Sequence, residues 1–151
     1  MKKTILFGLS IFLFWSCNNS SSKTTTHQQD EIHETHHHDE SLQVIELNNG
    51  EKWVVNSEMK PFVSKGAELV NVYVQENKTD FKELTTQLKE QNNQLIKSCT
   101  MKGKSHDELH KWLYPHLELV KELDNETDAV KAKEIVVKLQ NSYQQYQIYF
   151  N

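Results

Sequence analysis

Four side chains that bind soft metal ions fall within twelve residues of the sequence: Cys99, Met101, His106 and His110. His106 and His110 are four residues apart, so a helix places both imidazoles on one face. A thiolate and a thioether favour Cu(I), while two imidazoles with a thiolate also suit Zn²⁺ or Cu²⁺. The sequence therefore predicts a metal site, with copper favoured over zinc, if the fold brings these residues together.

The same segment also has an ordinary structural interpretation. Cys99 can be a small core residue at a helix end, Met101 can fill space in a turn, and the histidine pair can be half exposed. His116 follows Pro115, and we expect it to be a satisfied polar residue or a group that supports the ligands rather than a ligand. Both interpretations of the segment stay open at this stage.

These candidate ligands belong to a predicted helix–turn–helix corner. Apolar residues recur at spacings of three and four over residues 81–98 and again over about 105–123, which indicates two helices. Gly103 permits the chain to reverse, and Ser105 with Glu108 has the pattern of a capping box. Because only five residues join the two helices, the end of the first and the start of the second must be neighbours.

Two further helical patterns, over roughly 57–75 and 127–150, lie on either side of this corner. Short connections make successive helices antiparallel neighbours. The sequence therefore predicts an all-α fold, an up-down-up-down four-helix bundle.

A short β-hairpin is expected before the bundle. Asn49-Gly50 lies between the apolar runs 42–47 and 52–55, and both turn residues tolerate positive φ. Two strands alone are marginal in water, so the pair is expected to pack on the helices. The predicted folded domain spans residues 42–151.

The first sixteen residues, 1–16, have the form of a secretory signal, in which Lys2 and Lys3 precede a short apolar stretch. That stretch is too short to span a bilayer, which needs about 20 residues. It ends in Ser16-Cys17, which resembles the lipobox of bacterial lipoproteins. The resemblance implies cleavage before Cys17 and its acylation, so we expect a cell-envelope lipoprotein, on the outer membrane and facing the periplasm. The other interpretation is an uncleaved anchor in which Cys17 is merely apolar.

Export strengthens the metal interpretation of the corner. The chain has two cysteines, and a lipidated Cys17 leaves Cys99 without an intramolecular disulfide partner. A single exported thiol is a liability unless it is buried, bridged to another chain or bound to a metal.

Residues 17–41 are predicted to form a disordered tether. From Asn18 to Ser41 the chain has one Lys against five acidic residues, and Ile32 is its one aliphatic residue. Such a segment cannot bury enough apolar surface to offset its ordering entropy. Its clustered histidines can collect Zn²⁺, Cu²⁺ or Ni²⁺ weakly, and a hydrophilic spacer with incidental histidines is the equal alternative. The weak-binding candidates are His33, His36, His37 and His38.

Composition excludes several classes of function. The chain has 17 Lys, no Arg and 21 acidic residues, for a net charge of −4, whereas a nucleic-acid binder has a basic face with Arg forks. Four glycines are too few for a Gly-rich nucleotide-binding fold. The sequence also lacks Cys-x-x-Cys-His, paired Glu-x-x-His motifs and His-Glu-x-x-His. We therefore expect no enzyme and no nucleic-acid partner.

The segment Cys99-Thr-Met-Lys-Gly-x-x-His106-x-x-Leu-His110-x-x-Leu113, after Asn-Gly-x-Lys-Trp, resembles a group of small Bacteroidota-type lipoproteins and exported proteins over most of 42–123. The resemblance implies a helical bundle and a setting of heavy-metal handling, without an activity. We expect a lipid-anchored periplasmic protein that binds a copper or zinc ion for sequestration or delivery, with a metal-efflux or envelope protein as partner. The alternative is a non-metal envelope adaptor whose bundle surface docks a protein.

Overall fold

The computed structural model describes residues 44–151, and these residues contain four helices and no strand. The helices are α1 (Lys60–Gln75), α2 (Phe81–Ser98), α3 (Lys104–Asn125) and α4 (Ala129–Tyr149). The predicted signal, Cys17, the His-rich segment and the first two residues of the predicted hairpin lie outside the described residues.

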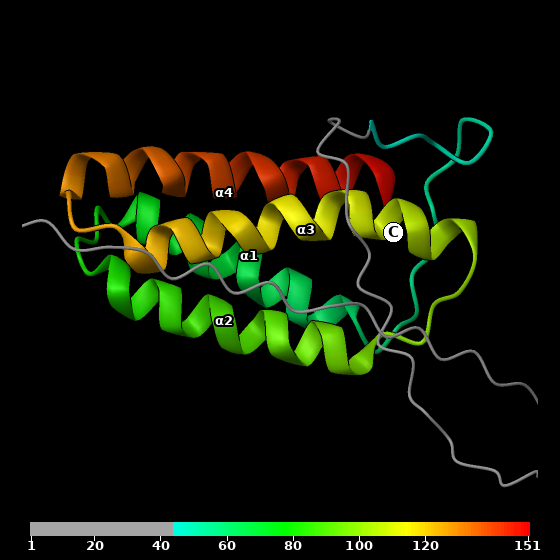
Figure 1. Ribbon diagram of the computed structural model, residues 1–151, viewed down its shortest axis with the longest axis horizontal. Helices are drawn as coiled ribbons and strands as arrows, with labels where there is room; N and C mark the ends of the chain where they lie inside the picture. Colours follow the sequence, from blue (N-terminus) through cyan, green and yellow to red (C-terminus); the bar gives the residue numbers. More distant parts are fainter. Residues whose placement is uncertain (1–43) are drawn as a thin grey trace, which may run out of the picture. The chain divides into compact units, whose positions relative to one another are not determined.

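Successive helices run in opposite directions (Figure 1). Helices α1 and α3 each pack against both α2 and α4. The predicted all-α fold is confirmed for the described residues, and the four helices are arranged as a bundle. The α2–α3 connection, which carries Cys99 and Met101, lies at one end of it (Figure 1).

Local sequence signals explain where three of the helices begin. Asp80 caps α2, because its carboxylate accepts a hydrogen bond from the Glu83 amide at 2.9 Å. Asp128 caps α4 by accepting from two amides, at 2.7 and 3.1 Å. Pro61 lies in the first turn of α1, where a missing N–H removes no helical hydrogen bond.

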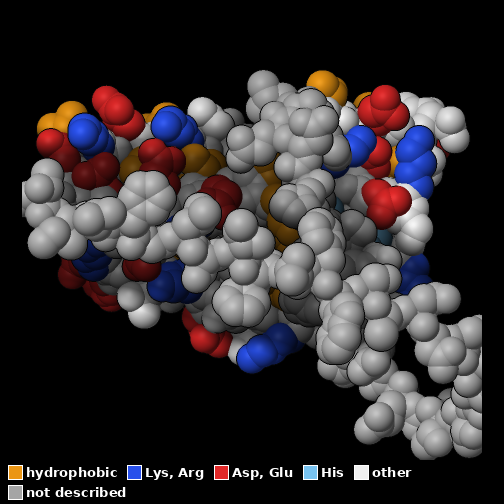
Figure 2. All heavy atoms as spheres, viewed as in Figure 1, with side chains coloured by type: hydrophobic (Ala, Val, Ile, Leu, Met, Phe, Trp, Pro, Cys, Tyr) orange, Lys and Arg blue, Asp and Glu red, His pale blue; other side chains and the backbone are white. Residues whose placement is uncertain are grey.

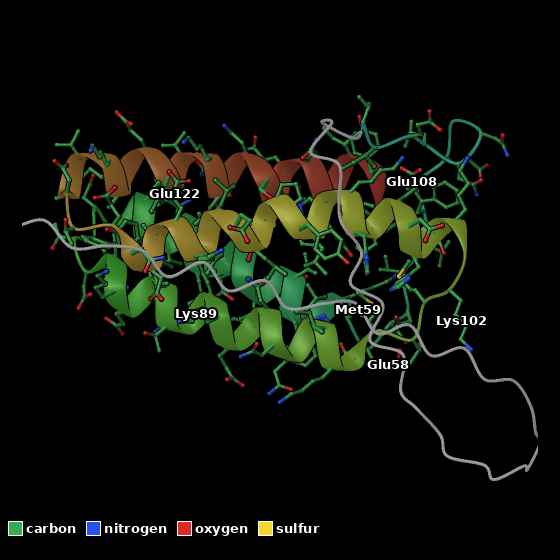
Figure 3. All side chains as sticks on the ribbon, viewed as in Figure 1. Glu58, Met59, Lys89, Lys102, Glu108 and Glu122 are labelled. Atoms are coloured by element: carbon green, nitrogen blue, oxygen red, sulfur yellow. The ribbon has the colours of Figure 1, made fainter. Side chains whose placement is uncertain are left out.

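The predicted capping box at the start of α3 is wrong. The helix begins at Lys104 without a side-chain cap, and Glu108 is only 2% exposed. One oxygen of Glu108, which is labelled in Figure 3, accepts from the Glu46 amide at 2.9 Å. The other oxygen accepts from Lys111 Nζ at 2.8 Å. Burial alone would raise the pKa of Glu108, but these hydrogen bonds hold its pKa below the ordinary 4.5. Glu108 therefore fastens the N-terminal segment to α3 instead of capping the helix.

The core follows the helical spacing of apolar residues at most positions. Fully buried examples from the four helices are Val70, Leu88, Leu109, Leu123, Ile135 and Leu139. The exceptions are informative: Ile96 and Val130 are exposed, and Ile45 is buried while Val44 beside it is exposed. In an extended segment a shift of one residue exchanges the buried and exposed sides.

The chain turns tightly at residues 48–51. Asn48 and Glu51 exchange backbone hydrogen bonds of 2.8 and 3.0 Å, and Asn49 and Gly50 both have positive φ. In the described residues the flanking segments form no strand with each other. Trp53 pairs instead with the last residues, its amide donating to the Tyr149 carbonyl at 2.7 Å.

The surface carries charges of both signs. Lys and acidic side chains are intermingled on the face shown in Figure 2. Within residues 44–151, none of the helices has the length and apolar character needed to cross a membrane.

Candidate metal site

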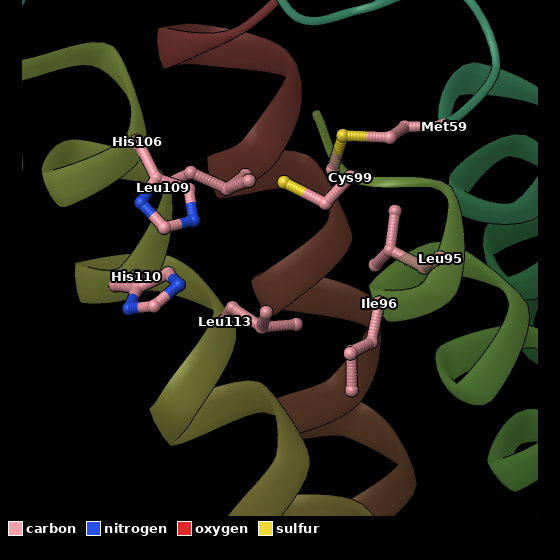
Figure 4. A pocket seen from close by; sticks show the side chains of 8 residues that line it. All are labelled: Met59, Leu95, Ile96, Cys99, His106, Leu109, His110 and Leu113. Atoms are coloured by element: carbon pink, nitrogen blue, oxygen red, sulfur yellow. The ribbon is translucent and has the colours of Figure 1, made fainter. Parts of the chain in front are cut away.

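A pocket of about 170 Å³ lies at the corner between α2 and α3 (Figure 4). It is lined by Met59, Leu95, Ile96, Cys99, His106, Leu109, His110 and Leu113. Three of the four predicted ligands therefore line one pocket. The fourth, Met101, is half-buried against the core and is not among the lining residues.

Gly103 sets the position of the two histidines. Its φ of 65° lies in the left-handed region that favours glycine. Its carbonyl accepts from the amides of His106 and Asp107 at 2.9 and 3.1 Å, which starts α3. The helix then places His106 and His110 on one face, with ring centroids 4.2 Å apart. The predicted juxtaposition of the two imidazoles is confirmed.

Cys99 is held in place by a side chain from a distant part of the sequence. The amide group of Asn56 donates to the Ser98 carbonyl at 2.9 Å and accepts from the Thr100 amide at 3.2 Å. These two bonds grip the backbone on both sides of Cys99. Asn56 therefore does not cap the first helix, which the sequence predicts from about residue 57 and which begins at Lys60.

The potential ligands face one another across the pocket but do not form a closed set. In Figure 4 the Cys99 sulfur lies across from the imidazoles of His106 and His110. Among residues 44–151, no three His, Cys, Asp or Glu side chains are grouped closely enough to hold a metal ion. A metal ion would have to draw Cys99 and the rings together, because metal–ligand bonds to sulfur and nitrogen are only about 2.0–2.3 Å long.

His116 lies on the same helix but is sealed inside the bundle. It is 0% exposed, and its ring stacks on Trp112 with centroids 4.9 Å apart and meets the Tyr143 ring edge-on at 4.7 Å. Its Nδ1 pairs with Ser142 Oγ at 3.0 Å, whereas Nε2 has no partner. Burial lowers the pKa of His116 to about 4. His116 is therefore a neutral core residue that does not line the pocket.

Sequence reasoning missed one donor of the pocket. Met59 precedes α1 and is fully buried, and by sequence it is one more apolar residue of a helical stripe. Forty residues separate it from Cys99, and no local pattern signals that the two share a pocket.

With two imidazoles, a thiol and a thioether on its walls, the pocket has the donor types of a soft-metal site. Comparison of this chain with protein-family models, with curated proteins and with solved structures finds no match.

Proposed function

We propose that this protein is a lipid-anchored, periplasm-facing carrier that binds a soft metal ion, copper in preference to zinc, in the α2–α3 pocket. The observation that carries the proposal is that Cys99, His106 and His110 line one pocket. Their chemistry supports it, because a thiolate with imidazoles binds copper and zinc better than it binds hard cations.

The shape of the pocket suits capture and release rather than permanent structural binding. Ile96 on its wall is 47% exposed, and Cys99 is half-buried. Structural zinc sites use four protein ligands in a closed tetrahedron, whereas an incomplete set leaves a position for an incoming ligand. A partner protein that accepts the ion can thus reach it at the surface of the bundle.

The anchor and the His-rich segment complete the proposal from the sequence. Acylation of Cys17 would hold the chain at the membrane, since each buried methylene contributes about 0.8 kcal/mol. His33, His36, His37 and His38 precede the first helix by 22 residues or more and would gather ions weakly. A metal-efflux or other envelope protein is the proposed recipient of the ion.

Metal analysis of the purified full chain tests the proposal. The four histidines of the weak site are first changed to Asn, so that only the pocket reports. We expect one equivalent of Cu(I), and one of Zn²⁺ at lower affinity, with both lost in Cys99→Ser.

Ser98→Ala is the matched control, because Ser98 precedes Cys99 and its hydroxyl donates to the Leu95 carbonyl of its own helix, outside the lining of the pocket. A wild-type chain that binds less than a tenth of an equivalent of either ion would overturn the proposal. That result would favour the adaptor function instead.

A further inference from the structure

Met59 presents a second sulfur atom to the pocket. Its side chain lines the same wall as Cys99 and is 0% exposed. In Figure 4 both sulfur atoms lie across the pocket from the imidazoles of His106 and His110. The pocket thus has nitrogen donors on one side and sulfur donors on the other.

The closeness of Met59 to Cys99 is built into the fold. Asn56, which grips the backbone around Cys99, is three residues before Met59. The Met59 amide donates to the Asn56 carbonyl at 3.1 Å, so a single turn links the two residues. Asn56 thus ties the turn before α1, which carries Met59, to the backbone around Cys99.

Thioether chemistry distinguishes the two metals that the pocket could take. Zinc in proteins is bound by Cys, His and carboxylate ligands. A thioether is a soft, neutral ligand that favours Cu(I) and adds little to Zn²⁺ binding. A methionine that lines the pocket would therefore raise the affinity for Cu(I) and leave the affinity for Zn²⁺ nearly unchanged.

We infer that Met59, and not Met101, is the thioether ligand of the pocket and makes it selective for Cu(I) over Zn²⁺. The inference rests on the proposed function, because it names the donor set of that same site. The Cu(I) ion is held by the sulfurs of Met59 and Cys99 together with imidazole nitrogen from the facing helix.

Two matched variants test the assignment. Met59→Leu and Met101→Leu make the same chemical change, and Leu is close to Met in volume. Cu(I) affinity is measured without oxygen by competition with a chromogenic chelator, and Zn²⁺ affinity by competition with a zinc dye. We expect Met59→Leu to weaken Cu(I) binding by about tenfold or more, on the scale of losses at metal sites. Zn²⁺ binding in Met59→Leu, and both affinities in Met101→Leu, should stay at the wild-type value.

X-ray absorption on selenomethionine protein locates the ligand directly. Apart from Met1, the sequence has two methionines, Met59 and Met101, so the Met101→Leu protein keeps selenium at residue 59 and the Met59→Leu protein keeps it at residue 101. We expect copper–selenium scattering in the first protein and none in the second. The Met101→Leu protein still contains Met59, so its copper–selenium signal tests the assignment even if Met59→Leu fails to fold.

The outcomes separate the two proposals. If the wild-type chain binds no metal, both fail. If it binds Cu(I) through Cys99 while copper–selenium scattering is absent from the Met101→Leu protein, only the assignment of Met59 is overturned. A parallel loss of Cu(I) and Zn²⁺ in Met59→Leu, without such scattering, overturns it as well.

Discussion

Helix α3 holds three histidines in two very different environments. His106 and His110 lie near its start, half-buried, with their rings 4.2 Å apart on the wall of a pocket. His116, less than two turns beyond His110, is 0% exposed and packed between aromatic rings. The difference arises from what faces the helix. At its start α3 faces the end of α2 and a turn, and farther along it faces the aromatic side chains of α4.

The comparison shows that burial decides what an imidazole can do. A metal ligand needs a nitrogen lone pair and a path for the ion. His106 and His110 line the pocket, which gives an ion a path to their rings. At His116 burial disfavours the charged form, and the ring serves as an aromatic packing element with one hydrogen bond.

The largest expected effect is on metal affinity. Removing both imidazoles in His106→Ala/His110→Ala should weaken Cu(I) binding about a thousandfold, or roughly 4 kcal/mol, because two donors are lost together. His116→Leu should leave Cu(I) affinity within about twofold of wild type, since His116 does not line the pocket. Competition with a chelator measures the Cu(I) affinity of both variants. An equal loss of Cu(I) affinity in the two would contradict the different roles given to the histidine pair and His116.

Acid should lower the stability of the fold because of the buried His116. The pKa of His116 falls from 6.5 to about 4 on folding, so the unfolded chain binds the proton more tightly. The fold therefore loses stability as the pH falls from 6.5 towards 4, by about 3 kcal/mol in all. Urea unfolding across this range should show the decline in wild type and a much flatter profile in His116→Leu. A wild-type profile that is level between pH 6.5 and 5 would contradict a neutral, buried His116.

A smaller effect is expected at Gly66, which packs against one of the aromatic rings around His116. Gly66 is in α1, and a β-carbon there would collide with the hydroxyl of Tyr143, the ring that packs on His116. Gly66→Ala should reduce the free energy of unfolding by about 1–2 kcal/mol, because overpacking outweighs the gain in helix propensity.

Adding Tyr143→Phe to Gly66→Ala should restore part of that loss, since it removes the atom in the closest contact. Thermal unfolding checks both variants, with Cu(I) affinity as the control that should stay unchanged. Stability equal to wild type in Gly66→Ala would show that Tyr143 moves without cost.

The helices could be predicted from the sequence because their signals are local. Apolar spacing gave 81–98 for α2, which is the observed span, and placed α3 and α4 within about two residues at each end. The start of α1 is three residues later than predicted, because the Asn56 side chain bonds to Ser98, Thr100 and Glu58 instead of capping the helix. A long-range contact had overridden a local preference.

The candidate site was predictable only in part, for the same reason. The His106–His110 pair follows from helical pitch, and Cys99 follows from the short turn. Met59 and the sealing of His116 could not be foreseen, because both depend on segments that are far away in the sequence. Glu108 shows the same limit: it matches a capping box locally, but burial against Glu46 and Lys111 determines where it bonds.

The grip of Asn56 on the Cys99 turn also has a consequence for folding kinetics. Its two hydrogen bonds span 42 and 44 residues of sequence, so they can close only once the segment before α1 and the end of α2 have come together. Closing a loop of this length costs chain entropy before its contacts form, so long-range contacts of this kind slow folding compared with local ones. A partly folded chain in which these two bonds have not closed would lack the hold of Asn56 on the backbone around Cys99.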